Sequence, residues 1–497
     1  MECKVVQGEI KKLPVDTIIS SLFEGAFEPG GATGSIDRSL NGLISKLISS
    51  GDISGKLGNV CVIYPQGLIP AMRVLIVGLG KREELNIESI RIASAQAIKK
   101  ARELRAKDVA TVIHGSGAGG FSHASASQAV IEGSLLGIYR FDQLKRKEEI
   151  GTDISTLTLV EFDPSKLAEV ETSVTITQKV IQGVYLTRDL INLPPNMATP
   201  TYLAQTAQQI AEEYGMKITV GDRDWAEKNH MGAYLGVAKG AGEPPKFIIM
   251  EHNGTHEELD TIVLVGKGIT FDTGGISIKP SEKMEEMKSD MAGAAAVIGT
   301  MKAVGMLNLP LRIIGIAPCT ENMPDAHAYR PADVITASNG KTIEIISTDA
   351  EGRLILADAL VYAKKYAPKA VIDLATLTGA CVVALGKNTA AGIFCNDSSL
   401  SDKLLRSGEK THERVWPMPL WDEYRKNIES SVADIKNSGG RNSGVSSSAI
   451  FLKEFIDYPW AHLDIAGMAL SEKDEGYTPL GATGYGVRLL VEFLQNW

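Results

Sequence analysis

The chain has 497 residues, 22% of them charged and 44% hydrophobic, and its formal net charge is −9. This length exceeds one ordinary hydrophobic core, so we expect two domains. The acidic balance provides no general attraction to phosphate backbones, and nucleic acid is not indicated as a partner. No run of about 18 apolar residues is present, so we expect no membrane-spanning helix.

The five cysteines are scattered, and they lack the paired spacing of a disulfide framework or a zinc site. Reduced thiols are typical of the cytoplasm, which is the compartment we expect. The stretch MECKVVQGEIKKLPVDTIIS at the start carries charges throughout and lacks the long apolar centre of a signal peptide. Both features favour a cytoplasmic protein.

Short apolar runs alternate with helical patterns over residues 1–165, which predicts a smaller N-terminal α/β domain. Residues 74–80 (VLIVGLG) are typical of a strand, and Asn86 can cap the helix that follows. The apolar spacing over 166–192 predicts one long linking helix. The prolines of LPPNMATPT then end it, because proline lacks a backbone donor. Residues 193–497 are expected to form a larger C-terminal α/β domain.

Four apolar, strand-like runs in the larger domain each lead into a polar or glycine-rich segment. Such runs suit strands that are buried on both faces of a sheet. In open α/β sheets, binding sites form beyond the carboxyl ends of the strands, so we expect the four polar segments to converge on one crevice. The runs and their segments are 261–266 with KGITFDTGG, 311–317 with PCTENM, 343–347 with TDAEGR, and 370–375 with TLTGA.

Charge is concentrated in residues 347–354 (STDAEGRL), where Asp349, Glu351 and Arg353 are two residues apart. If the preceding strand continues through Arg353, its period of two places all three side chains on one side, facing a single point. The alternative is a solvated turn with a local ion pair, which this motif by itself does not exclude.

A second segment, 267–299, favours the functional interpretation, because it contains Lys267, Asp272, Lys279 and Asp290 around a pair of glycines. Buried carboxylates in one crevice repel each other unless cations lie among them, and divalent metals meet that need. Oxygen-rich ligands with a bridging carboxylate are typical of a two-metal site. Lys267 can bind a metal only as a neutral amine, and taken alone it is more simply an ion-pair partner.

These segments, together with further blocks in the same order, resemble the cytosolic leucyl aminopeptidase family of two-metal exopeptidases. The resemblance spans residues 185–497 and is weaker over 1–165. It implies two α/β domains, the larger one a catalytic metallopeptidase domain with a central mixed sheet flanked by helices. The blocks are VGKGITFDTGG (265–275), MKSDMAGAAAV (287–297), STDAEGRL (347–354), ATLTGA (375–380), WAHLDIAG (460–467) and GATGYGVRLL (481–490).

The resemblance also implies a role for each site residue. Lys279 and Arg353 would be the catalytic pair, with Lys279 stabilising the oxyanion and Arg353 holding a bicarbonate that acts as general base. Two divalent ions per subunit, manganese or zinc, would activate a water to hydroxide. The implied ligands are Lys267, Asp272, Asp290 and Glu351 for one ion and Asp272, Asp349 and Glu351 for the other, and the implied substrate-binding residues are Met287, Thr376, Leu377, Gly379 and Ala466.

The resemblance therefore predicts an aminopeptidase that releases N-terminal residues, leucine-like ones preferred, from peptides with a free N-terminus. Specificity is expected to be broad, because each methylene in an apolar pocket contributes only about 1 to 3 kcal/mol. Family members form homohexamers, which we also expect here. A two-metal phosphoesterase and an inactive hexameric scaffold of the same fold are the alternatives. All implied ligand and catalytic positions are present, so we predict activity.

The sequence departs from the family pattern at two places. Ser347 replaces the usual asparagine, and Ala326-His327 and Ala332 replace Gly-Asn and Gly in one loop. We expect both loops to differ locally in shape. The serine-rich segment 439–450 matches no functional pattern.

Overall fold

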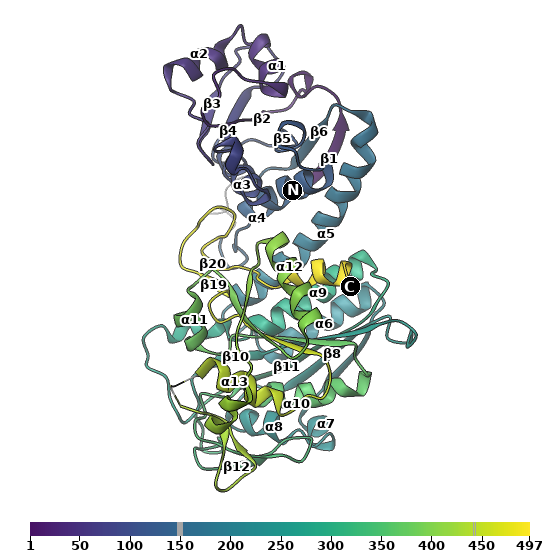
Figure 1. The fold of residues 1–497 in the computed structure, drawn as a ribbon, viewed down its shortest axis with the longest axis vertical. Helices are drawn as coiled ribbons and strands as arrows, with labels where there is room; N and C mark the ends of the chain where they lie inside the picture. The colour runs from purple at the N-terminus through teal and green to yellow at the C-terminus, as the bar shows by residue number, and fades with distance from the viewer. Residues whose placement is uncertain (147–152, 441, 443) are drawn as a thin grey trace. The chain divides into compact units, whose positions relative to one another are not determined.

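The computed structural model divides, over the residues it describes, into two compact units (Figure 1). The described residues are 1–146, 153–440, 442 and 444–497. The first unit contains Met1–Ile181 and Lys473–Leu480, and the second contains Gln182–Glu472 and Gly481–Trp497. The division falls inside helix α5 (Leu167–Asn192), and the boundaries expected from the sequence lie at the two ends of this helix.

Within the described residues, the first unit is built on a six-stranded sheet. In sheet order its strands are β1 (Glu2–Gln7), β6 (Thr156–Glu161), β5 (Asp108–Val112), β2 (Thr17–Leu22), β4 (Arg73–Gly78) and β3 (Val60–Ile63). Its helices include α1 (Gly31–Ser39), α2 (Leu43–Ser50), α3 (Ile87–Glu103) and α4 (His123–Ile138). Neighbouring strands are parallel except for β3 and β4. One buried cluster joins the sheet to α1 and α2.

Two local predictions for this unit are confirmed. The strand expected at 74–80 is β4. Asn86 caps α3, because its side chain accepts a hydrogen bond from the Ser89 amide at 2.9 Å. That bond satisfies one of the amides that a helix start leaves without a partner.

A buried histidine makes the stability of the first unit depend on pH. His114 follows β5, and burial lowers the pKa of its imidazole to about 4. In an unfolded chain a histidine titrates near pH 6.5. As the pH falls from there towards 4, the unfolded chain takes up a proton that the folded protein does not, so the folded state loses stability. The contribution of neutral His114 to the free energy of unfolding is fully present above pH 6.5. About 2 kcal/mol of this contribution is expected to be lost at pH 5.

Hydrogen exchange of the β5 amides at pH 7 and pH 5, corrected for intrinsic rates, measures this loss. The variant His114→Gln removes the titrating ring but keeps a polar group near Thr111 Oγ1, which lies 3.1 Å from His114 Nε2. The free energy of opening is expected to fall by about 2 kcal/mol more in the parent than in the variant. The same pH dependence in both proteins would contradict this role of His114.

In the part of the chain that the structure describes, the second unit is built on a nine-stranded mixed sheet. In sheet order its strands are β16 (Val415–Pro417), β15 (Ala391–Cys395), β18 (Trp460–Asp464), β14 (Ala370–Ala375), β9 (Thr261–Gly266), β11 (Arg312–Asn322), β8 (Lys246–His252) and β7 (Lys217–Gly221), with β10 (Gly268–Asp272) beside β11. The central strands β18, β14, β9 and β11 are parallel, and β8 and β7 add antiparallel pairs. The predicted central mixed sheet is confirmed.

Three of the four predicted apolar runs are β9, β11 and β14 of this sheet. Every residue of β9 and β14 is buried, as strands between two helical layers require. The helices are α9 (Ala292–Leu307), α6 (Pro200–Glu213) and α14 (Val487–Gln495) on one face, and α8 (Gly232–Val237), α10 (Gly352–Ala363) and α13 (Gly444–Lys453) on the other (Figure 1). Val263 and Val265 of β9 share a buried cluster with Leu356 of α10.

Helix α9 belongs to an unusually apolar segment. Met284–Leu307 is the one stretch of the described residues that is long and apolar enough to cross a membrane, and 78% of its most apolar window is buried inside the protein. The core of the second unit accounts for this composition, because α9 packs on β9, β11 and β14. This unit also contains α7 (Arg223–Lys228), α11 (Gly379–Leu385), α12 (Ser398–Thr411), β19 (Leu470–Ser471) and β20 (Gly481–Ala482).

The fourth predicted run, 343–347, does not join the large sheet, so that part of the prediction is wrong. Among the described residues, its own sheet consists of β12 (Val334–Thr336), β13 (Thr342–Glu344) and β17 (Ile435–Lys436). Ile343 and Ile345 are buried, but Ile346 is 45% exposed. This alternation suits a strand with one buried face, whereas β9 and β14 are buried on both.

The chain is not extended through Arg353 either, so the period-two arrangement of Asp349, Glu351 and Arg353 is wrong. Glu351 has helical φ and ψ of −77° and −37°, and α10 begins at the next residue. The run 354–356 decides this, because its buried side chains pack α10 into the core. The charges meet at the start of a helix instead of along a strand.

Ala332 occupies the left-handed region, with a φ of +75°, where the resembled family usually has glycine. Its amide donates to the Ile345 carbonyl at 2.7 Å, which holds the loop in this conformation. A Cβ in this region costs about 1 to 2 kcal/mol, which glycine would avoid. The greater conformational freedom of glycine in the unfolded chain offsets part of that gain in stability. Ala332→Gly is therefore expected to stabilise the protein by about 0.5 to 1 kcal/mol in urea denaturation.

The matched control for this substitution is Ala326→Gly in the same loop, where φ is not left-handed. This change raises the conformational entropy of the unfolded chain without relieving backbone strain. It is therefore expected to leave stability unchanged or to lower it by up to about 1 kcal/mol. Equal shifts of the urea midpoint in the two variants would show that Ala332 is not strained.

Candidate active site

A cavity of about 630 Å³ lies beyond the carboxyl ends of β9 and β14. Residues of three predicted polar segments line the cavity. These are the segment after β9, the segment that begins at residue 348, and the segment after β14. The fourth segment, 318–323, mostly belongs to β11 and supports the site from outside the lining. Asn322 Nδ2 donates to Asp272 Oδ1 at 2.7 Å and to the Thr348 carbonyl at 3.0 Å. The expected convergence thus holds for three segments.

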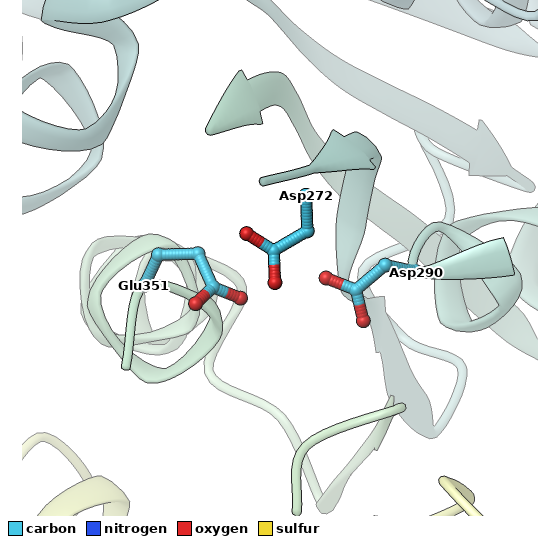
Figure 2. A group of neighbouring side chains, drawn as sticks. All are labelled: Asp272, Asp290 and Glu351. Atoms are coloured by element: carbon cyan, nitrogen blue, oxygen red, sulfur yellow. The ribbon is translucent and has the colours of Figure 1, made fainter. Parts of the chain in front are cut away.

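Asp272, Asp290 and Glu351 form a buried carboxylate cluster in this cavity (Figure 2). Asp272 ends β10, Asp290 lies two residues before α9, and Glu351 immediately precedes α10. One oxygen of each carboxylate lies within 4.8 Å of the others. Glu351 Oε2 is buried and accepts no hydrogen bond from the described residues. Such a set of oxygen atoms fits a divalent cation.

Lys267 lies against these carboxylates and is only 3% exposed. Its Nζ is 2.8 Å from Asp290 Oδ1 and 2.9 Å from Glu351 Oε1, and it donates to the Thr376 carbonyl at 2.9 Å. Burial acts to lower the pKa of Lys267, but the two carboxylates outweigh burial and raise that pKa. Gly352 permits the approach, since a Cβ there would lie 2.5 Å from Lys267 Cε. Lys267 is therefore an ammonium that offsets part of the cluster's charge.

The carboxylates of the cluster titrate abnormally. Burial raises the pKa of Asp290 well above its usual range, although Lys267 acts against it. Burial, with the charge of Glu351, also raises the pKa of Asp272. Burial acts to raise the pKa of Glu351 as well, but Lys267 and Lys279 outweigh it and that pKa is lowered. Negative charge in excess of the nearby lysines must be neutralised by a proton or by a bound cation.

Asp349 and Lys279 extend the cluster. Lys279 Nζ lies 2.9 Å from Asp272 Oδ2 and 2.5 Å from Asp349 Oδ1. The Asp349 side chain is 38% exposed, yet partial burial raises its pKa to about 6. Gly274 permits this arrangement, because its φ is +86° and a Cβ there would lie 2.8 Å from Asp349 Oδ1. Asp349 thus adds a fourth, more accessible carboxylate.

Arg353 lies in the first turn of α10 and is buried. Its Nη1 donates to the Asn437 carbonyl at 2.8 Å, while its Nε is buried without a hydrogen-bond partner in the described part of the chain. Burial lowers the pKa of Arg353 to about 10, although Glu351 and Asp464 act to raise it. A buried guanidinium that lines the cavity and keeps an unbonded N–H can receive a small anion.

All the metal-binding and catalytic residues implied by the resemblance therefore line this cavity, as do the five implied substrate-binding residues. The metal-binding and catalytic residues are Lys267, Asp272, Lys279, Asp290, Asp349, Glu351 and Arg353, and the others are Met287, Thr376, Leu377, Gly379 and Ala466.

Asp464, at the end of β18, holds the segments of Leu377 and Ala466 that line the cavity, and the sequence interpretation did not single it out. Its Oδ1 accepts hydrogen bonds from the amides of Leu377 and Ala466, each at 3.2 Å. Its Oδ2 accepts one from Thr378 Oγ1 at 2.6 Å. Its place at a strand end was the available signal, whereas the buried Asn437 carried none, because an isolated asparagine forms no motif.

Two family models match the chain. The catalytic domain of the cytosol aminopeptidase family matches residues 185–491, and the N-terminal domain of the same family matches residues 21–148. The chain belongs to the cytosol aminopeptidase family. The family resemblance and the two-domain α/β fold expected from the sequence are confirmed.

Relatives and solved structures agree over nearly the whole chain. A probable cytosol aminopeptidase of Geobacter sp. (strain M21) is 46% identical, with 97% of this chain and 98% of the relative covered. A relative of the same description from Roseiflexus castenholzii (strain DSM 13941 / HLO8) is 43% identical, covering 100% and 99%. A tomato leucine aminopeptidase mutant superposes with a TM-score of 0.89 at 34% identity, covering 100% and 97%. The bottromycin maturation enzyme BotP in complex with Mn gives 0.84 at 32% identity, covering 97% and 99%.

The protein is therefore a metallo-aminopeptidase, a hydrolase that acts on peptides, as the sequence predicted. Its carboxylate cluster suits the divalent metals on which the family depends. The two alternatives, a phosphoesterase and an inactive scaffold of the same fold, are not favoured.

Proposed function

We propose that this enzyme releases N-terminal residues, leucine-like ones preferred, at the cluster of Asp272, Asp290 and Glu351. The buried cluster, with an unbonded carboxylate oxygen in a partly apolar cavity, is the observation that carries the proposal. Two divalent ions per subunit, manganese or zinc, would be bound here. Lys267, Asp272, Asp290 and Glu351 would hold one ion, and Asp272, Asp349 and Glu351 the other, with the Asp349 carbonyl as a further ligand.

Lys267 serves as a ligand only after it loses a proton. Bound divalent ions would supply the positive charge that lowers the pKa of Lys267, polarise the scissile carbonyl and activate a water near neutral pH. In the structure the Lys267 ammonium already contacts Asp290 and Glu351. These carboxylates therefore exchange one cationic partner for another when the site is filled.

Lys279 stabilises the negative charge that develops on the scissile carbonyl oxygen. Burial acts to lower the pKa of Lys279, but Asp272, Glu351 and Asp349 outweigh burial and raise that pKa. Lys279 therefore keeps its positive charge at neutral pH, which this role requires.

Arg353 binds and orients a bicarbonate ion through N–H groups that the protein leaves unbonded. A guanidinium cannot accept a proton at neutral pH, so Arg353 cannot itself be the general base. Its contribution is to place a basic anion beside the carboxylate cluster.

The free α-amine of the substrate faces the cluster, which restricts cleavage to the N-terminal residue. Met287, Leu377 and Ala466 give the side chain of that residue an apolar wall. Thr376, whose Oγ1 donates to Asp290 Oδ1 at 2.7 Å, and Gly379 complete the wall. Because apolar contacts discriminate weakly, leucine-like residues are preferred without strict specificity.

The test is hydrolysis of leucyl amide by metal-stripped protein before and after manganese or zinc is added back. N-acetylleucyl amide is the matched substrate control, because it keeps the side chain and the scissile bond but lacks the free amine. We expect metal-dependent cleavage of the free-amine substrate alone. Cleavage of both amides would contradict the role of the amine. Cleavage of a phosphodiester in place of both would overturn the proposal.

The enzyme works in the cytoplasm as a homohexamer. The relatives' description as cytosol aminopeptidases supports the compartment, as do the cysteines, all of which lie in the described residues as free thiols. Light scattering of the full chain tests the assembly. A mass six times that of the chain is expected, and a monomer would overturn this part of the proposal.

A further inference from the structure

The amide of Asn437 is enclosed by the loop that carries Asp349. Asn437 follows β17 and is fully buried. Its Oδ1 accepts hydrogen bonds from the amides of Ile346 at 2.8 Å and Ser347 at 3.3 Å. Its Nδ2 donates to the carbonyls of Ser347 at 2.7 Å and Ala350 at 3.4 Å. One side chain thus bonds four backbone groups of a single loop.

The backbone of Asn437 extends this contact in both directions along the chain. Its amide donates to the Glu344 carbonyl at 2.9 Å, before the loop. Its carbonyl accepts from Arg353 Nη1 at 2.8 Å, after the loop. Asn437 therefore bonds to residues on both sides of Asp349 and Glu351, which lie between these two contacts.

Two of the loop's side chains, Ile346 and Asp349, are exposed, and only Thr348 and Ala350 are buried, so the loop depends on hydrogen bonds to other segments. Ile346 is 45% exposed and the Asp349 side chain 38% exposed. Thr348 is held separately, since its Oγ1 donates to the Gly274 carbonyl at 2.6 Å. Ser347 offers only its Oγ, which accepts from the Asp349 amide at 3.2 Å. Asn437 bonds the amides of Ile346 and Ser347 and the carbonyls of Ser347 and Ala350.

The chemistry of the contact selects an amide. Two backbone N–H groups require an acceptor and two carbonyls require a donor, and among side chains of this length only asparagine provides both. A carboxylate would face the Ser347 carbonyl without a proton to donate. Alanine would remove the Asn437 partner of all four backbone groups and leave the Ser347 carbonyl with only the Ala350 amide, at 3.4 Å.

We infer that Asn437 is a positioning residue of the metal centre. It holds the loop 346–350 and the Arg353 guanidinium so that Asp349 and Glu351 point into the cavity, and it touches neither substrate nor metal. This inference rests on the proposed roles of those three charged residues. Residues that orient metal ligands typically change metal affinity or activity by about 10- to 100-fold when they are replaced.

The experiment compares Asn437→Ala and Asn437→Ser with the parent chain. Manganese affinity is measured by titration of stripped, full-length protein, and kcat and KM are measured with leucyl amide. We expect manganese affinity and kcat to fall about 10- to 100-fold in Asn437→Ala, with a smaller change in KM. Asn437→Ser keeps a hydroxyl that can replace one hydrogen bond, so it should fall between the alanine variant and the parent.

Asn396→Ala is the matched control. Asn396 also clamps the backbone, donating to the Tyr458 carbonyl at 2.9 Å and accepting from the Trp460 amide at 2.7 Å, but it lies outside the cavity lining. It should lower the melting temperature and leave manganese affinity and kcat unchanged.

The inference is overturned if manganese affinity and kcat of the Asn437 variants stay within about twofold of the parent, or fall no further than in Asn396→Ala. If Asn437→Ala does not fold, Asn437→Ser decides by the same criterion. Failure of the proposed function looks different, because the parent chain itself would then neither bind manganese nor cleave leucyl amide.

Discussion

Replacing Asp272 or Glu351 with alanine is expected to abolish metal retention and aminopeptidase activity together. Each carboxylate belongs to both proposed ligand sets, and both lie within 4.8 Å of each other and of Asp290. A loss beyond about 100-fold in kcat is expected, because even residues that only orient a metal ligand cost about 10- to 100-fold. Metal content after dialysis and hydrolysis of leucyl amide measure the two effects.

Glu286→Ala is the matched control for these variants. Glu286 also lines the cavity, but it pairs with Lys283 at 3.6 Å and lies outside the carboxylate cluster. This variant is expected to keep its metal and its activity. The first unit should remain folded in all three proteins, as read from hydrogen exchange of the β5 amides. Unchanged turnover in either the Asp272 or the Glu351 variant would refute the ligand assignment.

The central strands could be predicted from the sequence because burial on both faces leaves a direct signal. The residues of β9 and β14 are mostly apolar and all buried. Each strand leads into polar residues at its carboxyl end, where Lys267 and Thr376 line the cavity. Both parts of this pattern are local in the sequence, so one stretch predicts both the strand and the site that follows it.

The geometry of Glu351 and Arg353 could not be predicted in the same way. Their charges indicated a site, but the backbone conformation depends on how the following residues pack. Helix α10 begins at Gly352 because its apolar face fits the core beside β9, a contact between segments far apart in the sequence. The sequence therefore predicts the chemistry of this motif but not its backbone conformation.

The residues that hold the site leave a weaker signal in the sequence than those proposed to carry its chemistry. Asn437 and Asp464 bond mainly to backbone groups, which every residue type possesses. Asn437 is 90 positions from Ser347. No residue pattern indicates a hydrogen bond between a side chain and a distant backbone group, because almost any amino acid could supply that backbone group. Only the folded backbone reveals that these side chains support the loops around the cavity.

Replacing Lys279 with methionine is expected to lower kcat by about 100- to 1,000-fold while metal remains bound. Methionine keeps an unbranched side chain but lacks the ammonium that is proposed to stabilise the oxyanion. Asp272 and Asp349 lose a cationic partner in this variant, so their affinity for manganese should be retained or strengthened. The measurements are kcat for leucyl amide and manganese affinity by titration.

Lys283→Met separates this role from a general effect of positive charge in the cavity. Lys283 lines the same cavity, but it pairs with Glu472 at 3.2 Å, away from the carboxylate cluster. Its replacement should change kcat by less than about twofold, because exposed ion pairs contribute little. If Lys279→Met lost its metal along with its activity, Lys279 would act by organising the ligands instead of stabilising the oxyanion. If its kcat matched that of Lys283→Met, Lys279 would have no catalytic role.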